Sequence, residues 1–347
     1  MKCFSTKSRQ RDLLMCTRPL AVSVALVVSV VLADRSFAAA QETGGMGEVS
    51  TAQDLSAAVE LAAIPSAMTF SNAQFGSAGV GLRNQKGGGI VLSGVKAPVK
   101  AAFIYWAVIT QGAATTNEEK IQVQRLLPAP ASSAVILTGT VVGTGATPCW
   151  DGDTITVMRA TIPLNIATGN GSYQVTILPG ATGATDGSDP WVKRVLPEFE
   201  GASIVIVGTG SATVSIFDSG LSGHTFHGNP GLTYMLMLPT SATGNLTLFD
   251  NIGADGQQGT SRTAVKGAAD EKTTINSVVI AGPGSIYNDS DWNGEAGDPL
   301  PQLWDDTGHD ITAATPNGTT TLNITIKNKG ESLYDCLTPV ANVVQVE

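Results

Sequence analysis

From Ala67 onward, the chain consists of short runs of Val, Ile, Thr and aromatic residues that are separated by Gly, Asn, Asp and Pro. Many of these runs alternate apolar and polar residues, as in TTLNITI at 320–326. A period of two places one side of a strand on a core and the other side in water. The pattern predicts an all-β chain of antiparallel β-sandwich, jelly-roll-like type, and it does not fit alternating strands and helices.

The expected strands fall into two series. The first series is 89–92, 99–109, 120–127, 135–142, 154–162, 172–178, 202–207 and 212–217, and the second is 232–238, 245–249, 273–280, 320–326 and 341–346. One helix is expected at 51–63, where Ala, Leu and Glu dominate and Pro65 follows as a stop.

Five landmarks recur in the same order in both series. They are a Gly-x-Gly segment after a β-branched strand, a Trp-Asp pair, an Asn-Gly turn, a strand that ends in Thr-Ile, and a closing β-branched strand. The recurrence predicts two related sandwich units at 67–220 and 221–347, after a signal peptide at 1–40 and a lead at 41–66 that holds the expected helix. Chance matches among Gly- and Val-rich strands are the alternative.

The N-terminus has the composition of a secretory signal peptide. Five basic residues precede an apolar run at 20–32, and the small residues SFAAAQ follow. We expect cleavage after Ala38 or Ala40. The run is shorter than the roughly 20 residues of a membrane-spanning helix. The chain is therefore expected to be secreted or held at the cell surface, with no transmembrane segment after cleavage.

Charge and cysteine content narrow the function classes. Removal of 1–40 takes away six of the 20 basic and two of the 29 acidic residues, which leaves a net charge of −13. This balance argues against nucleic-acid binding and suits a soluble protein that attracts cations. Cys149 and Cys336 remain, so one disulfide is expected in an oxidising compartment, with two free thiols as the alternative.

The stretch 281–312 holds the strongest candidate site. Residues 289–294, DSDWNG, alternate oxygen-bearing side chains and place a glycine sixth, as in the first half of a calcium loop. The twelfth place is Leu300 where an EF-hand has Glu, so no EF-hand follows. The candidate calcium ligands are Asp289, Asp291, Asn293, Glu295 and Asp298. A solvated acidic turn without an ion is the alternative.

A weaker metal candidate consists of Asp250 and Asp255 in the segment DNIGADG, which also fits a turn between strands. The second series is enlarged beside the stronger candidate, because Gly284 lies twenty residues before Trp304 whereas Gly145 lies five before Trp150. Insertions in a sandwich fall in loops, where binding function tends to lie.

Four of the five tryptophans lie in Gly-, Asp- or Pro-containing stretches and are candidates for ligand binding: Trp150, Trp191, Trp292 and Trp304. Exposed rings beside acidic and amide side chains would suit carbohydrate binding. The alternative is that they close the ends of the sandwich. Trp106 lies in an apolar strand and is expected in the core.

Signals for catalysis are weak, and no catalytic residue is assigned. His224 and His227 form an H-x-x-H without the Glu of a zinc protease helix, and no G-x-S-x-G motif is present. Asp305 and Asp306 are a poor acid/base pair, because neighbouring residues of a strand point to opposite faces.

Several segments resemble those of secreted bacterial β-sandwich proteins of unknown function that occur as cell-surface modules. They are KAAFIYWAVIT (100–110), VVGTGATPCWDG (141–152), FEGASIVIV (199–207), DGQQGTSR (255–262), and IAGPG with DWNG and PLPQLWDD. The resemblance implies a secreted or surface role and carries no catalytic assignment.

Two functional hypotheses follow. The first is a non-catalytic secreted or surface module that binds calcium and adheres to an extracellular glycan or a surface protein. The second is a secreted hydrolase that acts on polysaccharide with carboxylates from separate loops. Two carboxylates that face each other across a sugar-sized cleft would favour the hydrolase, and isolated acidic turns on a closed sandwich would favour the module.

Overall fold

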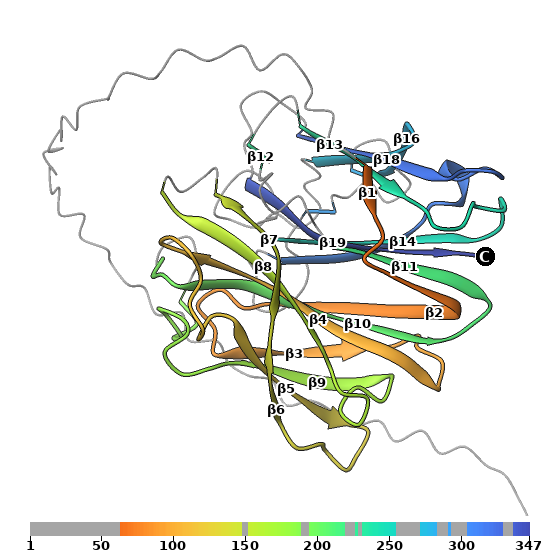
Figure 1. Ribbon diagram of the computed structural model, residues 1–347. Helices are drawn as coiled ribbons and strands as arrows, with labels where there is room; N and C mark the ends of the chain where they lie inside the picture. The colour runs from red at the N-terminus through yellow and green to blue at the C-terminus, as the bar shows by residue number, and fades with distance from the viewer. Residues whose placement is uncertain are drawn as a thin grey trace, which may run out of the picture. The chain divides into compact units, whose positions relative to one another are not determined.

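The alternation of apolar and polar residues is realised as strands of three β-sheets (Figure 1). The computed structural model describes residues 63–147, 152–188, 194–218, 226–227, 231–254, 271–282, 291–292, 304–328 and 336–347. Within these ranges the helical structure is one 3-10 turn, η1 (Thr312–Ala314). The strand pairs are antiparallel except for the short pair β1–β13. The expected all-β antiparallel fold class is confirmed.

The largest sheet has the strand order β17-β14-β19-β11-β2-β10-β4-β8-β7, and β12 also pairs with β19. Its strands are β2 (Met68–Gly81), β4 (Val99–Thr110), β7 (Thr140–Ala146), β8 (Thr154–Thr161), β10 (Glu198–Thr209), β11 (Ala212–Asp218), β12 (Phe226–His227), β14 (Thr247–Ala254), β17 (Trp304–Asp310) and β19 (Cys336–Val346). Both halves of the chain therefore contribute to one sheet.

Two smaller sheets complete the fold. The four-stranded sheet has the order β3 (Gly87–Leu92), β9 (Gly171–Ile177), β5 (Lys120–Leu127) and β6 (Val135–Thr138). The five-stranded sheet has the order β1 (Ala63–Pro65), β13 (Leu232–Met237), β18 (Thr321–Asn328), β15 (Glu271–Ile275) and β16 (Val278–Ala281).

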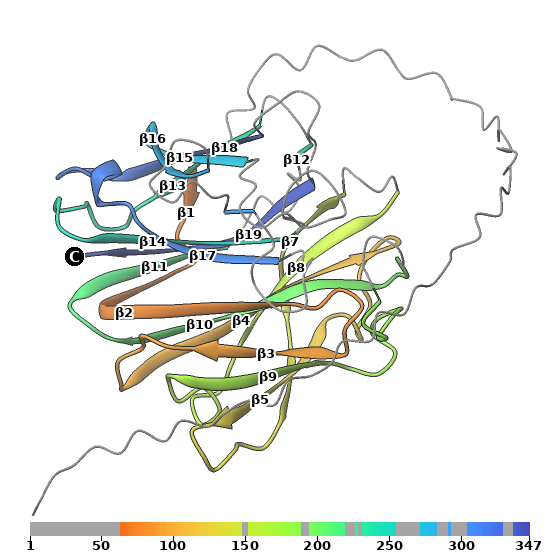
Figure 2. The ribbon, with the colours of Figure 1, turned by 180° about the vertical axis from the view of Figure 1, so that it is seen from behind.

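The sheets form successive layers, from β5 and β9 through β4 and β10 and then β14 and β19 to β13 and β18 (Figures 1 and 2). One core, around Trp106, lies under the four-stranded sheet, and a second, around Phe249, lies under the five-stranded sheet. A third, which we call the central core, lies between two portions of the large sheet and includes Tyr105, Val205 and Ile252. The large sheet is thus covered on both faces, which explains why β10 is buried over almost its whole length and has an unbroken apolar run at 204–207.

The expected strands 135–142 and 273–280 are each divided in two. Residues 135–138 form β6 and residues 140–146 form β7, in different sheets. The break is at Gly139, where a Cβ would lie 2.5 Å from the Trp106 ring. In the second case β15 and β16 form a hairpin whose turn residues Asn276 and Ser277 have φ of 48° and 70°. Residues 68–81 and 304–310 are strands that the sequence pattern missed.

The two expected units are joined rather than separate. Strand β11, from the first, pairs with β19, from the second, and β1 precedes both but pairs with β13. The landmark strands β9 and β18 both lie inside the smaller sheets, whereas β7 is an edge strand of the large sheet and β16 is an edge strand of a small one. Ala63, the last residue of the expected helix, begins β1, and the rest of that helix lies outside the described residues.

Glycines at the layer contacts give a test of this packing. A Cβ at Gly253 in β14 would lie 2.1 Å from the Trp292 ring, whereas a Cβ at Gly89 in β3 would meet nothing within 4 Å. We expect Gly253→Ala to lower the free energy of unfolding by about 1–3 kcal/mol through overpacking. Gly89→Ala should leave it nearly unchanged. Urea unfolding, followed by fluorescence, measures the stability of both variants. A Gly253→Ala midpoint equal to that of the wild type would contradict the packing of Trp292 against Gly253.

Candidate functional site

The polar residues of β14 and β17 are divided between the two faces of the large sheet. In this antiparallel pair, Asp250 lies opposite Gly308 and Ile252 lies opposite Asp306. Because side chains alternate along a strand, Asp250 and Asp306 face the central core together with Ile252. Asp305 and His309 face the other way, toward the five-stranded sheet. The adjacent carboxylates of 305 and 306 are thus separated by the sheet, as the alternation predicts.

On the side of the five-stranded sheet lie Asp291 and Trp292 of the motif DSDWNG, residues 289–294, which we call the acidic segment. Asp291 Oδ1 is hydrogen-bonded to His309 Nε2, and Oδ2 is buried and accepts no hydrogen bond. The Trp292 ring is fully buried over Gly253. Burial lowers the pKa of His309, but the hydrogen bond and charge of Asp291 outweigh it and raise that pKa overall.

Deeper on the same side, three polar side chains cross from the five-stranded to the large sheet. Tyr234 Oη donates to Asn342 Oδ1 at 3.0 Å, and Asn342 Nδ2 donates to Asn251 Oδ1 at 3.0 Å. All three residues are buried, and their hydrogen bonds to one another replace the hydrogen bonds that water makes with them in the unfolded chain. We assign it a structural role, because it lies among apolar side chains of this core.

On the central-core side, Asp250 and Asp306 lie beside two serines. Ser77 Oγ, from β2, donates to Asp306 Oδ2 at 2.9 Å, and Trp304 Nε1 donates to Ser203 Oγ, from β10, at 2.9 Å. Asp250 is 2% exposed, and its Oδ2 has no hydrogen-bond partner. Burial raises the pKa of Asp250 to about 6, and burial together with the charge of Asp250 raises that of Asp306.

A second charged cluster lies where β10 begins. Arg83 donates through Nε and Nη2 to both carboxylate oxygens of Glu200, at 2.7–3.2 Å. Arg83 Nε also lies 3.4 Å from Glu198 Oε1, and Arg194 bridges Glu198 to Asp153. A register shift between Phe199 and Gly201 places Glu200 in a β-bulge, a feature that re-aims side chains.

Glu198 is the carboxylate of this cluster whose proton affinity is most changed. It is 1% exposed, and neither of its oxygens is within hydrogen-bonding geometry of a donor. Burial raises the pKa of Glu198 to about 7, although the charge of Arg83 opposes the shift. Such a group can exchange a proton near neutral pH.

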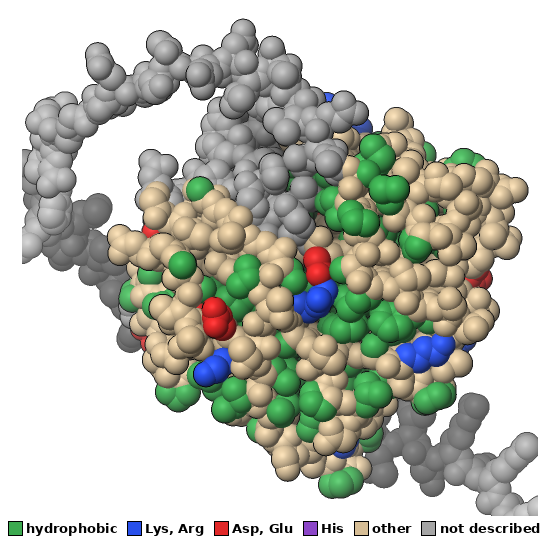
Figure 3. All heavy atoms as spheres, in the orientation of Figure 1, with side chains coloured by type: hydrophobic (Ala, Val, Ile, Leu, Met, Phe, Trp, Pro, Cys, Tyr) green, Lys and Arg blue, Asp and Glu red, His purple; other side chains and the backbone are tan. Residues whose placement is uncertain are grey.

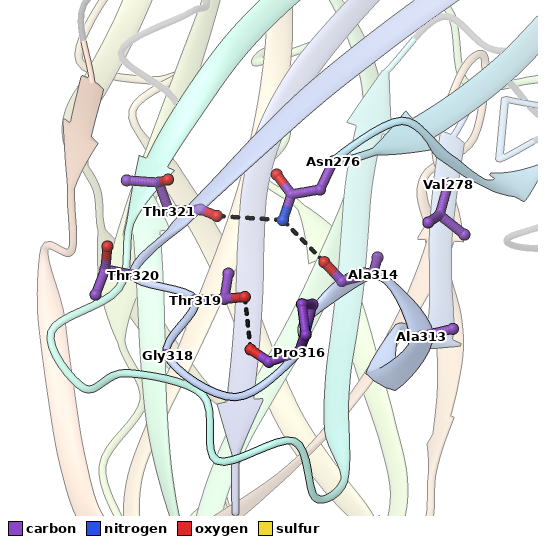
Figure 4. Close-up of a pocket in the computed structure, with 9 residues that line it drawn as sticks. All are labelled: Asn276, Val278, Ala313, Ala314, Pro316, Gly318, Thr319, Thr320 and Thr321. Atoms are coloured by element: carbon purple, nitrogen blue, oxygen red, sulfur yellow. Dashed lines mark hydrogen bonds between the residues drawn. The ribbon is translucent and has the colours of Figure 1, made fainter.

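A shallow hollow of about 530 Å³ lies at one end of the five-stranded sheet (Figure 4). Asn276 Nδ2 donates to the carbonyl oxygens of Ala314 and Thr321 at its rim, at 2.9 and 3.3 Å. The other lining groups are threonine hydroxyls and small apolar side chains, without a carboxylate or a histidine. Its chemistry suits uncharged polar groups. On the face of the molecule that Figure 3 shows, charged side chains are scattered among uncharged ones.

Most of the predicted metal ligands lie outside the described residues: Asp289, Asn293, Glu295, Asp298 and Asp255. Asp291 is described and is tied to His309. Asp250 corrects the expectation of a turn, because it lies within β14 and is held there by pairing with both Gly308 and Val343. In the described ranges, no three His, Cys, Asp or Glu side chains are grouped as for a metal ion.

The expectation of exposed ring faces is wrong for Trp292 and Trp304, which are both fully buried. Glycines make room for them: Gly253 lies under Trp292, and a Cβ at Gly201 would lie 2.3 Å from Trp304. Trp150, Trp191 and Cys149 lie outside the described residues, as does the side chain of Cys336 at the start of β19. No helix in the described part of the chain has the length and hydropathy of a membrane span.

Sequence reasoning missed Arg83, Glu198 and Glu200. The sequence did contain a signal for the two acidic residues. Glu198 and Glu200 precede a run of apolar residues that is expected to be buried, and buried carboxylates need partners. The partner Arg83 follows a Gly-rich strand with weak alternation and could not be placed without the fold. Ser77 was missed for the same reason.

Comparisons with known proteins give only remote likenesses. No protein family and no curated protein matches the chain. The ANX2 ectodomain from Arabidopsis thaliana aligns with 80% of this chain and 82% of its own, at 10% identity and a TM-score of 0.24. Peptide:N-glycanase F aligns with 80% of this chain and 96% of its own, at 11% identity and a TM-score of 0.26. TM-scores this low support no functional inference.

The pKa of Glu198 sets a pH dependence of stability. Because folding raises this pKa from 4.5 to about 7, the folded state binds the proton more tightly, and stability falls as pH rises between these values. The slope from one such group is at most about 1.4 kcal/mol per pH unit. Glu198→Gln, which stays neutral, should therefore gain stability relative to the wild type between pH 5 and pH 7.5.

Urea unfolding at the two pH values measures this difference. Glu200, Asp250 and Asp306 also have raised pKa values and contribute slopes of the same sign in both proteins, so the comparison isolates Glu198. Glu119→Gln serves as the control and should parallel the wild type. A Glu198→Gln profile that also parallels the wild type would contradict the assignment.

Proposed function

We propose that this is a non-catalytic secreted or surface β-sandwich protein that binds calcium through its acidic segment and adheres to a glycan or protein partner. The observation that carries the proposal is the carboxylate of Asp291. His309 holds its Oδ1, while Oδ2 is buried and accepts no hydrogen bond. A buried carboxylate oxygen is costly unless a proton, a donor or a cation satisfies it.

The sequence around Asp291 favours a cation. Asp291 occupies the third place of DSDWNG, and the oxygen-bearing Asp289 and Asn293 flank it at the first and fifth places. Hard cations such as calcium prefer these oxygen ligands. A ligand whose second oxygen is fixed by a neighbouring side chain is already oriented, which strengthens binding. His309 would have this orienting role, and Trp292 would anchor the segment in the core.

The adhesive part of the proposal rests on the compartment and on the scaffold. The N-terminal sequence favours export, and the doubly covered sheet supplies a rigid support for surface loops. Since Trp292 and Trp304 are buried, they cannot stack on sugars. Glycan contacts would instead use hydroxyl and amide groups, of which the hollow beside Asn276 offers several.

Calcium titration tests the proposal directly. After chelator treatment, the wild type should give saturable heat at millimolar calcium in calorimetry, because the segment offers several carboxylates to one cation. Asp289→Ala and Asp291→Ala should each weaken binding at least tenfold. Glu119→Ala, which removes a carboxylate elsewhere, should bind like the wild type. Absence of heat in the wild type at millimolar calcium would reject calcium binding.

A polysaccharide hydrolase is the second candidate, and the cluster at Glu198 favours it. Arg194 brings Glu198 together with Asp153, so carboxylates from two separate segments meet, and a group with a raised pKa suits acid or base catalysis. The proposed module should release no reducing ends from a panel of polysaccharides. Release by the wild type that is lost in Glu198→Gln would favour the hydrolase instead.

A further inference from the structure

Asp250 and Asp306 form a carboxylate pair at the boundary between two layers. They are diagonal neighbours on β14 and β17, on the side that faces the central core. Such neighbours in an antiparallel pair lie within reach of each other. Asp250 is buried and Asp306 is half-buried, so the pair lies at the margin of the core with access to water on one side.

Two hydroxyl groups from the opposite layer reach the pair. Ser77 Oγ, from β2, donates to Asp306 Oδ2 at 2.9 Å. A Cβ placed on Gly79, also in β2, would lie 2.7 Å from Ser203 Oγ and 3.0 Å from Asp306 Cβ, so these side chains meet above that glycine. Oxygen atoms from four strands thus converge on one place.

The pair has no compensating positive charge nearby on its own face. Among the residues that the structure describes, neither carboxylate has an ion-pair partner. The cation that acts on Asp250 is His309, which lies on the other face of the sheet and is bonded to Asp291. Asp250 Oδ2 is buried without a hydrogen bond. A carboxylate pair at the margin of a core needs a proton or a cation to neutralise it.

We propose that Asp250 and Asp306, with the hydroxyl oxygens of Ser77 and Ser203, bind a hard divalent cation of the calcium class. Calcium accepts six to eight oxygen ligands in a flexible geometry. Two carboxylates and two hydroxyls supply part of that shell, and water on the side of Asp306 completes it. Burial and the charge of Asp250 raise the pKa of Asp306, whereas the hydrogen bond from Ser77 lowers it, and a bound cation would favour the ionised, ligating form.

The cation would link the layers as well as neutralise the pair. Its ligands come from β14 and β17 on one side of the central core and from β2 and β10 on the other. Binding to the folded state alone stabilises it, so the metal should raise the melting temperature. This site lies on the opposite face of β14 from Asp291 and takes no ligand from the acidic segment.

Thermal unfolding of the full chain after chelator treatment tests the site. Millimolar calcium should raise the melting temperature of the wild type by about 5 °C, as expected for a ligand at many times its Kd. The double variant Asp250→Asn with Asp306→Asn should lose the part of this rise that comes from the site at the central core. Asp310→Asn, which changes an exposed carboxylate at the end of β17, should keep it, as should Asp289→Ala with Asp291→Ala.

Terbium luminescence gives a readout that separates the two sites without removing ligands. Trp304 is hydrogen-bonded to Ser203 and would sensitise Tb³⁺ bound there, whereas Trp292 belongs to the acidic segment. Trp304→Phe should lower the emission severalfold at a site that calcium competes for, and Trp292→Phe should spare that part.

Three results would overturn the proposal. One is the absence of Tb³⁺ emission from the wild type, a result that does not depend on the folding of any variant. Another is a calcium-induced rise that is as large in the Asp250 and Asp306 double variant as in the wild type. The third is a rise that is lost only in the Asp289→Ala with Asp291→Ala variant. That result would assign the metal to the acidic segment, and a proton shared by Asp250 and Asp306 would then neutralise the pair.

Discussion

The coverage of both faces of the large sheet is the constraint on which the rest of the structure depends. Strand β10 is buried on either side, and a polar side chain on such a strand can be satisfied only by a group from another segment of the chain. Arg83 satisfies Glu200 with a bidentate contact, and Ser203 accepts from Trp304. The cluster around Ser203 marks where layers meet, whereas the partners of Glu198 and Glu200 come from the segments that connect strands.

Glycines set the spacing of these layers. Gly201 and Gly79 allow Trp304 to lie against β10 and β2, and Gly253 does the same for Trp292. A close approach of backbone to an indole brings the neighbouring polar side chains within hydrogen-bond distance, as between Asp306 and Ser77. The two tryptophans thus pack inside the protein beside polar groups instead of presenting their rings to a ligand.

The parts of the fold that local pattern determines were predictable, and those that depend on distant partners were not. Residues 120–127 alternate cleanly and form β5 with the expected bounds. By contrast, WDDTGHD at 304–310 looks like a polar loop, and it becomes a strand because β14 offers an edge for pairing. The same holds for the Gly-rich β2. Asp291 was found from its motif, but its bond to His309, eighteen residues away, required the fold.

The two carboxylate sites on β14 and β17 are electrostatically linked although they lie on opposite faces. The charge of Asp291 raises the pKa of Asp250, and the charge of His309 lowers it. Because coulombic effects are weakly screened between buried groups, a positive charge gained on one face favours the ionised carboxylate on the other. The same positive potential opposes a second cation on the other face, so cation binding at one site would weaken binding at the second, and by linkage the effect must be reciprocal. Only the thickness of one sheet separates the two sites, and because both faces of that sheet are covered, little water screens the charges from each other.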